Sequence, residues 1–136
     1  MEIKDVIIKR ESVRSFQDKK IPDLSEIISL ARKCPSAGAI RGFDIIVTKK
    51  EIAPYNAPLY AVILTNPEAY ARYGERGKNL YSVQDATIFG AYFQLLLVDM
   101  GLSSVWIGAF RESRVQRDIK TELRPIAIIA VGYEKC

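Results

Sequence analysis

Hydrophobic residues occupy nearly every position between residues 81 and 100, in the stretch YSVQDATIFGAYFQLLLVDM. Its length and continuity predict one long helix, and a helix that is apolar on all sides is normally a buried one. Ser82 and Asp85 stand three positions apart, the spacing of a capping-box pair at a helix start. Gly101 provides a natural end. Gly90 is unfavourable in a helix interior by about 1 kcal/mol relative to alanine, which points to close packing at that position.

Polar residues within this helix indicate a protein interior rather than a lipid one. The stretch approaches the length of a membrane span, but charged and amide side chains at membrane depth are rare. Here they are Gln84, Asp85, Gln94 and Asp99. The first residues, MEIKDVIIKRES, lack the uninterrupted apolar segment of a signal peptide. We therefore expect a cytoplasmic protein that does not bind a membrane.

Shorter patterns surround the central helix. Residues 66–79 are polar and predict a helical turn followed by a loop. Apolar residues at helical spacing, or charged helix-compatible residues, predict further helices over residues 3–10, 22–34 and 111–121. Runs of branched residues predict strands over residues 43–48, 59–65, 105–107 and 125–133.

The order of these segments predicts the fold class. Helices and strands alternate irregularly rather than in strict βαβ units, which favours an α+β fold. We expect a mixed, mainly antiparallel sheet flanked by helices, with the central helix buried on the sheet or against a second subunit. No linker, repeat or low-complexity segment divides the chain, so residues 1–136 are expected to form a single domain.

Composition excludes several classes of function. The 136 residues are 49% hydrophobic and 26% charged, which is ordinary globular composition. The net charge is +4, but the basic residues lie in scattered pairs, and a phosphorylated small molecule would use them as well as a nucleic acid would. Histidine is absent, which excludes histidine-based triads and His-ligated zinc. Cys34 and Cys136 form no metal-binding spacing, and Cys34 is expected to be a core residue.

Phosphate-binding loops of the common kinds are also missing. No GxGxxG follows a predicted strand, so a Rossmann site is not supported. The segment GERGK, residues 74–78, has too few residues between its glycines for a P-loop.

A short basic segment, RESVRSF at residues 10–16, is the first candidate for binding. If it is extended, Arg10, Ser12 and Arg14 lie on one face, because side chains in a strand repeat every second residue. Two guanidiniums beside a hydroxyl would suit a phosphate or an anionic ring edge. Spacing alone favours the alternative of a solvated basic loop.

Four blocks in this order resemble the FMN-dependent nitroreductase family. They are RESVRSF, PSAGAIRGF, YGERGKNLYSVQDA, and GLSSVWIGAF followed by PIAIIAVGY. The third block is particularly similar to the branch related to azoline-oxidising dehydrogenases. The resemblance extends from about Ile3 to Tyr133 and favours a binding role for the basic segment.

The resemblance implies a homodimer with FMN at the subunit interface and the central helix in the dimer core. Arg10, Ser12 and Arg14 fall on the motif that contacts the phosphate, ribityl chain and pyrimidine edge of the flavin. A second motif, whose loop reaches the FMN of the other subunit, corresponds to Pro35, Ser36 and Ala37. The segment whose backbone amides lie beside the flavin corresponds to Ile107 and Gly108. No catalytic side chain and no metal is expected, because the flavin carries the chemistry.

The chain departs from the family pattern in three places. Ala39 replaces an Asn, and Arg41-Gly42-Phe43 replaces a Gln-Pro-Trp-like triplet, so that Arg41 is a candidate for a different flavin contact. No basic tail follows the last predicted strand, which leaves phosphate binding to Arg10 and Arg41. The early strands lack a helical insertion between them, so we expect an open site, shaped by Tyr70, Tyr73 and Tyr81.

Three functions are compatible with these observations. The first is an FMN-dependent oxidoreductase that uses NAD(P)H to reduce a small organic acceptor, such as a nitroaromatic or a quinone, by ping-pong transfer. The second is a non-catalytic flavin-binding homodimer on the same scaffold, and the third is a structural partner subunit. The sequence names neither the acceptor nor the preferred nicotinamide cofactor.

Overall fold

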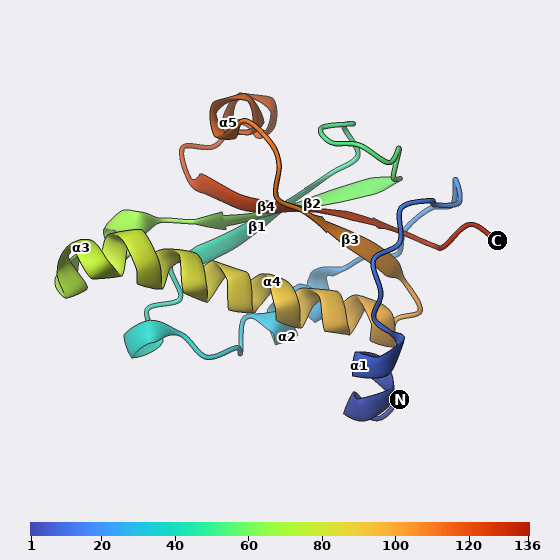
Figure 1. Ribbon diagram of the computed structural model, residues 1–136, viewed down its shortest axis with the longest axis horizontal. Helices are drawn as coiled ribbons and strands as arrows, with labels where there is room; N and C mark the ends of the chain where they lie inside the picture. Colours follow the sequence, from blue (N-terminus) through green and yellow to red (C-terminus); the bar gives the residue numbers. More distant parts are fainter.

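A four-stranded sheet forms the middle of the computed structural model, which describes residues 1–136 (Figure 1). Its strands lie in the order β1-β2-β4-β3, and all three pairings are antiparallel. The only parallel contact is a single bridge between Ser12 and Ser104. The α+β class is therefore confirmed. The strands are β1 (Phe43–Thr48), β2 (Leu59–Thr65), β3 (Ser103–Ile107) and β4 (Arg124–Gly132).

Helices cover both faces of the sheet. In Figure 1, α5 lies above one face, and α1, α2 and α4 lie on the opposite side. The α-helices are α1 (Ile3–Lys9), α2 (Ser25–Ala31), α3 (Gly74–Arg76), α4 (Ser82–Asp99) and α5 (Glu112–Ile119). Three short segments of tighter or wider helix are η1 (Ala37–Ala39), η2 (Pro67–Tyr73) and η3 (Gly77–Tyr81).

Alternation along the central strands creates two cores. In β2, Ala61 and Ile63 face α4, whereas Tyr60, Val62 and Leu64 face the side of α5, because successive side chains point to opposite faces. The larger core combines α2, α4 and one sheet face, and the smaller combines α5 with the other. Both faces of β2 are buried, which is why its sequence is a continuous apolar run.

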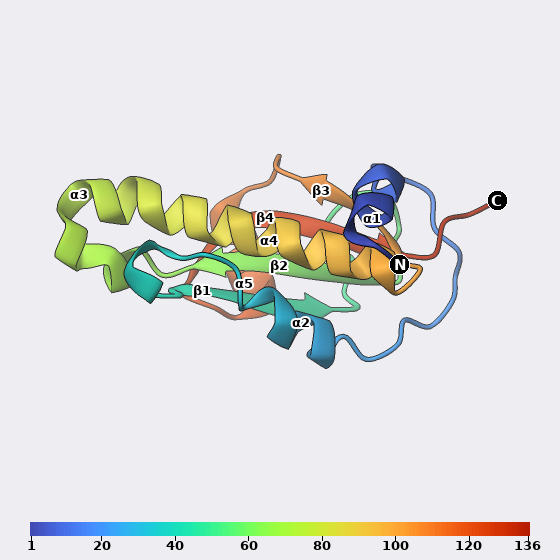
Figure 2. The ribbon, with the colours of Figure 1, turned by 90° about the horizontal axis from the view of Figure 1, so that it is seen from below.

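The long helix α4 crosses the sheet diagonally (Figure 2). Phe89, Phe93 and Leu97 are fully buried against the sheet. A Cβ atom at Gly90 would lie 2.7 Å from the ring of Trp106 on β3. The close packing expected at Gly90 is thus a contact within the chain.

The opposite face of α4 is not buried by the chain itself. Ala91 and Tyr92 are exposed, and Tyr92 shows 41% of its surface. The neighbouring α1 exposes Ile3 and Ile7, at 62% and 57%. A hollow of about 580 Å³ between α1, α2 and α4 is lined by nine residues, of which eight are hydrophobic. None of the helices combines the length and apolarity that a bilayer crossing requires.

The segment before α4 differs from the prediction. Residues 67–73 form η2, the chain turns at Gly74, whose φ of 68° and ψ of −155° lie outside the helical region, and residues 75–81 then run into α4 without a break. Gly77 has a packing reason instead, because a Cβ atom there would clash with the carbonyl oxygen of Tyr70. Because the helix continues, Ser82 does not cap it, and the Ser82 hydroxyl donates to the carbonyl of Lys78 at 2.6 Å.

The start of α2 also differs. The helix begins at Ser25 rather than at Pro22, and the Asp23 carboxylate accepts from the Ser25 hydroxyl at 2.8 Å. The expected core role of Cys34 is confirmed, since its side chain is fully buried. Burial raises the pKa of the Cys34 thiol, which therefore stays protonated at neutral pH.

Candidate functional site

The basic segment after α1 is extended and lies beside the start of β3. The Val13 amide donates to the Ser104 carbonyl at 3.0 Å, and Val13 and Phe16 are buried. Arg10, Ser12 and Arg14 are exposed. We call these three residues the donor strip.

The side chains of the donor strip are free of internal partners. Neither Arg10 nor Arg14 forms a hydrogen bond or an ion pair through its guanidinium, in a protein where four other cationic side chains pair with carboxylates. The fold therefore presents two unneutralised cations and one hydroxyl to a ligand. This donor set fits an anionic, oxygen-rich molecule such as a flavin nucleotide.

The end of β3 supplies an open backbone edge. Since β3 is the last strand of the sheet, its outer side is unpaired beyond the bridge at Ser104. Ile107 is buried by its side chain, which packs in the core beneath α5, whereas Gly108 is exposed, with no atom within 4 Å of a Cβ built on it. Backbone groups at this edge are available to a ligand that approaches closely.

The second predicted motif, Pro35 to Ala37, lies at the other end of α4. The Ser36 hydroxyl donates to Asp85 at 2.6 Å, and the Ala37 amide donates to both oxygens of that carboxylate, at 3.2 and 3.1 Å. One guanidinium nitrogen of Arg41, Nη1, donates to the carbonyls of both Arg32 and Cys34. This nitrogen is therefore already hydrogen-bonded within its own loop.

The two groups of predicted residues do not meet within one chain. Gln94 on α4 donates to the Ser104 hydroxyl at 3.1 Å, and Ser104 pairs with Ser12 of the donor strip. The donor strip therefore lies near the C-terminal part of α4. Asp85, beside the second motif, is nine residues before Gln94, which corresponds to about 14 Å along a helix axis. The donor strip and β3 form one half of the predicted site, and the loop after α2 forms the other.

Sequence reasoning missed two polar residues that organise this loop. Asp85 was expected to cap α4, but it is 4% exposed and accepts from Ser36, Ala37 and Tyr70. The Tyr70 hydroxyl donates to Asp85 at 2.7 Å and accepts from the Gly42 amide at 3.1 Å. Burial, followed by the hydrogen bond to Asp85, raises the pKa of Tyr70 to about 12, so it remains a proton donor.

Of the three tyrosines expected to shape the site, Tyr73 and Tyr81 reach the surface and Tyr70 does not. Tyr70 is fully buried, and its expected role in lining an open site is wrong. Tyr73 and Tyr81 meet edge to face at a centroid distance of 5.4 Å. Tyr81 also borders an open hollow of about 630 Å³ that Pro35, Ser36 and Ala37 line.

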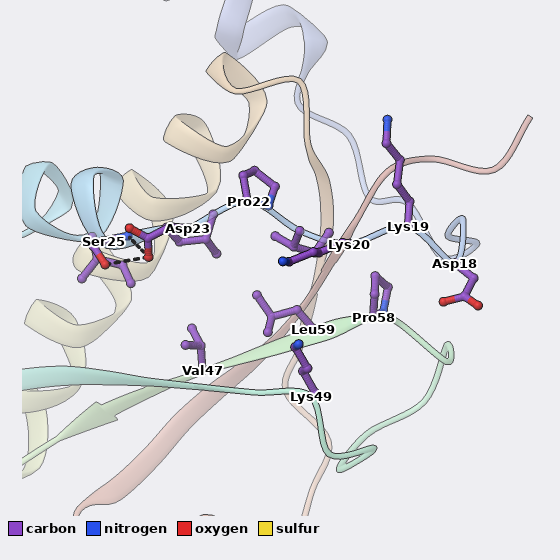
Figure 3. Close-up of a pocket in the computed structure, with 13 residues that line it drawn as sticks. Asp18, Lys19, Lys20, Pro22, Asp23, Ser25, Val47, Lys49, Pro58 and Leu59 are labelled. Atoms are coloured by element: carbon purple, nitrogen blue, oxygen red, sulfur yellow. Dashed lines mark hydrogen bonds between the residues drawn. The ribbon is translucent and has the colours of Figure 1, made fainter.

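A separate hollow of about 520 Å³ lies at the C-terminal end of β1, away from the loop that precedes this strand (Figure 3). Lys19, Lys20 and Lys49 surround it, with Val47 and Leu59 among its apolar residues. None of the predicted flavin-binding residues lines this hollow.

Comparison with known proteins defines the class of this fold. A solved nitroreductase family protein from Streptococcus pneumoniae TIGR4 superposes with a TM-score of 0.91, 21% identity, and coverage of 99% of this chain and 92% of that chain. A solved FMN-dependent nitroreductase from Clostridium difficile R20291 gives a TM-score of 0.80 and 23% identity, covering 96% of this chain and 87% of that one. The architecture is therefore the nitroreductase fold.

The sequence extends this conclusion from fold to family. The profile described as Nitroreductase family matches residues 7–55 and 48–133, so the chain belongs to the nitroreductase family. A relative from Methanothermobacter thermautotrophicus, named as a candidate NADH dehydrogenase/NAD(P)H nitroreductase, is 26% identical over 154 residues. That match covers 98% of this chain and 78% of the relative.

Proposed function

We propose that this protein is an FMN-dependent oxidoreductase that uses NAD(P)H to reduce a small organic acceptor. The observation that carries the proposal is the donor strip, whose cations have no partner in the fold and lie beside an open strand edge. The names of two similar proteins support it, one as an FMN-dependent nitroreductase and one as an NAD(P)H nitroreductase.

Each half of the site has a role in holding the cofactor. We assign Arg10 to the FMN phosphate, Ser12 to the ribityl hydroxyls and Arg14 to the pyrimidine edge. At that edge, the Arg14 cation stabilises the negative charge of a reduced flavin. The backbone at Ile107 and Gly108 orients the ring. When bound, FMN supplies the hydride and electron chemistry, so the chain needs neither histidine nor a metal.

We further propose a homodimer in which Pro35, Ser36 and Ala37 reach the flavin held by the partner. The separation of the two half-sites along α4 supports this arrangement, because one chain alone does not bring them together. The exposed apolar face of α1 and α4 supports it as well, since a contiguous apolar surface of this kind marks an interaction site.

A ping-pong sequence follows from the openness of the site. NAD(P)H and the acceptor would bind in turn over the same ring, next to the Tyr73 and Tyr81 pair. We infer a planar acceptor such as a nitroaromatic or a quinone, because an aromatic pair stacks well on flat rings.

Absorption spectroscopy tests the cofactor and the activity together. Purified protein, with FMN added and the excess removed, should retain flavin absorption that NAD(P)H bleaches and an acceptor restores. A protein that retains no flavin would overturn the proposal. Flavin that dithionite bleaches but NAD(P)H does not would favour the alternative, a non-catalytic flavin-binding homodimer.

Light scattering of surface variants tests the dimer. Tyr92→Glu places a charge on the apolar face and should yield a monomer that releases FMN. Val47→Glu is the matched control, because Val47 is as exposed as Tyr92, at 42%, but lies on β1. If both variants remain dimeric, the interface lies elsewhere.

A further inference from the structure

The loop between α2 and β1 is held by a buried hydrogen-bond network centred on Asp85. Three donors converge on this carboxylate: the Ser36 hydroxyl at 2.6 Å, the Tyr70 hydroxyl at 2.7 Å and the Ala37 amide at 3.1 Å. The partners come from segments 49 and 15 residues away in sequence, so the network ties distant parts of the chain together.

The direction of each hydrogen bond is fixed. The Arg41 amide donates to the Ser36 hydroxyl at 2.8 Å, and the Gly42 amide donates to the Tyr70 hydroxyl at 3.1 Å. A backbone amide can only donate, so each hydroxyl accepts one hydrogen bond and uses its own proton toward Asp85. The carboxylate therefore stands at the end of two chains of hydrogen bonds that begin at the loop backbone.

The loop needs this support because its backbone is strained. Gly38, Ala39 and Arg41 have φ angles of 53°, 55° and 53°, in the left-handed region. Alanine and arginine rarely adopt that region, and residues held there persist only where their surroundings determine them. The network reaches both sides of the strained segment, at Ala37 and at Arg41.

We propose that Asp85 is a positioning residue for the flavin site, which fixes the loop from Ser36 to Gly42 in the shape that presents Ser36 and Ala37 to the cofactor. The inference rests on the proposed function. Asp85 itself is only 4% exposed, and it acts through the backbone that it orders. Its carboxylate is required as an acceptor of several donors, a role that an apolar residue of equal size would not fill.

The test combines loop exchange with flavin binding in the full-length protein. In Asp85→Asn, one oxygen becomes a donor that opposes the Ala37 amide. Amide hydrogen exchange at Ala37, Arg41 and Gly42 should accelerate at least about tenfold, as expected for loss of a charged hydrogen bond that limits local opening. The dissociation constant for FMN should rise by a similar factor.

Three further variants serve as two controls and one independent test of the loop network. Asp18→Asn makes the same change at an exposed residue that forms no side-chain hydrogen bond or ion pair and lies outside the proposed interface, and it should leave both measurements unchanged. Ile63→Val weakens the core without touching the loop, and should lower global stability while FMN affinity is retained. Ser36→Ala removes one donor and should repeat the effect on loop exchange, even if Asp85→Asn fails to fold.

The inference would be overturned by loop amides that stay protected in Asp85→Asn and Ser36→Ala, or by an opened loop with unchanged FMN affinity. Loss of FMN in Ile63→Val to the same degree would also overturn it, since general destabilisation would then be the cause. A wild-type protein that takes up no FMN would refute the proposed function, and loop exchange alone would decide whether Asp85 fixes the loop.

Discussion

The two halves of the proposed flavin site are built in opposite ways. The donor strip is held by its backbone, which bridges to β3, and its side chains remain free. The loop from Ser36 to Gly42 is held by side chains: its hydroxyl and backbone amides donate hydrogen bonds to Asp85 and Tyr70. Side chains without a hydrogen-bond partner in the fold are available to bind a ligand, whereas side chains that are hydrogen-bonded within the fold fix the shape of the loop.

This contrast predicts two kinds of mutational response. Changes in the donor strip should affect binding and leave stability intact. Changes in the loop network should affect stability first and binding as a consequence. The following variants test that division.

Removing both guanidiniums of the donor strip should have the largest effect. In the double variant Arg10→Ala and Arg14→Ala, FMN affinity should fall about a hundredfold or more, because a hydrogen bond to a charged group contributes about 1.5–3 kcal/mol. The free energy of unfolding should change by less than about 0.5 kcal/mol, since neither side chain has a partner. Fluorescence titration and urea unfolding measure the two quantities.

Arg114→Ala with Arg117→Ala is the matched control. Both arginines are exposed on α5, across the sheet from α4. An equal loss of affinity in this control would show that net charge, and not the donor strip, binds FMN.

Tyr70→Phe should lower stability before it affects binding. The Asp85 carboxylate loses a donor and the Gly42 amide loses its acceptor, both in a buried site, so the free energy of unfolding should fall by about 1–3 kcal/mol at neutral pH. Tyr73→Phe, at an exposed position, should change it little. A stability loss in Tyr73→Phe equal to that in Tyr70→Phe would contradict the role of burial.

The same residue makes stability depend on alkaline pH. The pKa of Tyr70 is raised from 10 to about 12 by folding, so the native state keeps a proton that the unfolded chain releases. This contribution is complete below pH 10 and is lost as the pH rises toward 12. It amounts to roughly 2–3 kcal/mol, and urea unfolding between pH 9 and 12 should show a smaller alkaline loss in Tyr70→Phe than in the wild type.

The smallest effect is expected at Ala39. Its left-handed backbone is unfavourable for alanine and more readily adopted by asparagine. Ala39→Asn should therefore raise the free energy of unfolding by about 0.5 kcal/mol without loss of FMN affinity. Ala71→Asn, at an exposed position with a negative φ, is the control. Stabilisation by both variants would contradict an effect of backbone conformation.

The sequence predicted the parts of the fold that depend on local pattern. The branched runs at residues 43–48 and 59–65 are β1 and β2 with the expected bounds. The extended backbone of the donor strip was only one of two alternatives in the sequence, and it is the backbone bridge to β3, with Val13 and Phe16 buried beside it, that makes the segment extended. The division of α4 into a buried and an exposed face was not readable, since apolar residues occupy both.

Contacts between distant segments explain what the sequence concealed. The end of residues 66–79 was predicted as a loop, but only Gly74 turns the chain, whereas Gly77 lies within a helix where the Tyr70 carbonyl leaves no room for a Cβ atom. Asp85 matched a local capping pattern, but its partners lie in other segments. Neither feature leaves a signal at short spacing, and an alignment of related sequences would be needed to find such pairs.

The packing of Trp106 against Gly90 gives the protein a built-in optical probe. Trp106 is the only tryptophan of the chain, so intrinsic emission comes mainly from this ring. It stands directly before Ile107 and Gly108, and it touches the middle of α4. A flavin beside β3 would quench this emission by energy transfer, whereas local unfolding of α4 would shift the wavelength of maximum emission. One fluorescence spectrum would thus separate cofactor occupancy from the integrity of the helix that spans both half-sites.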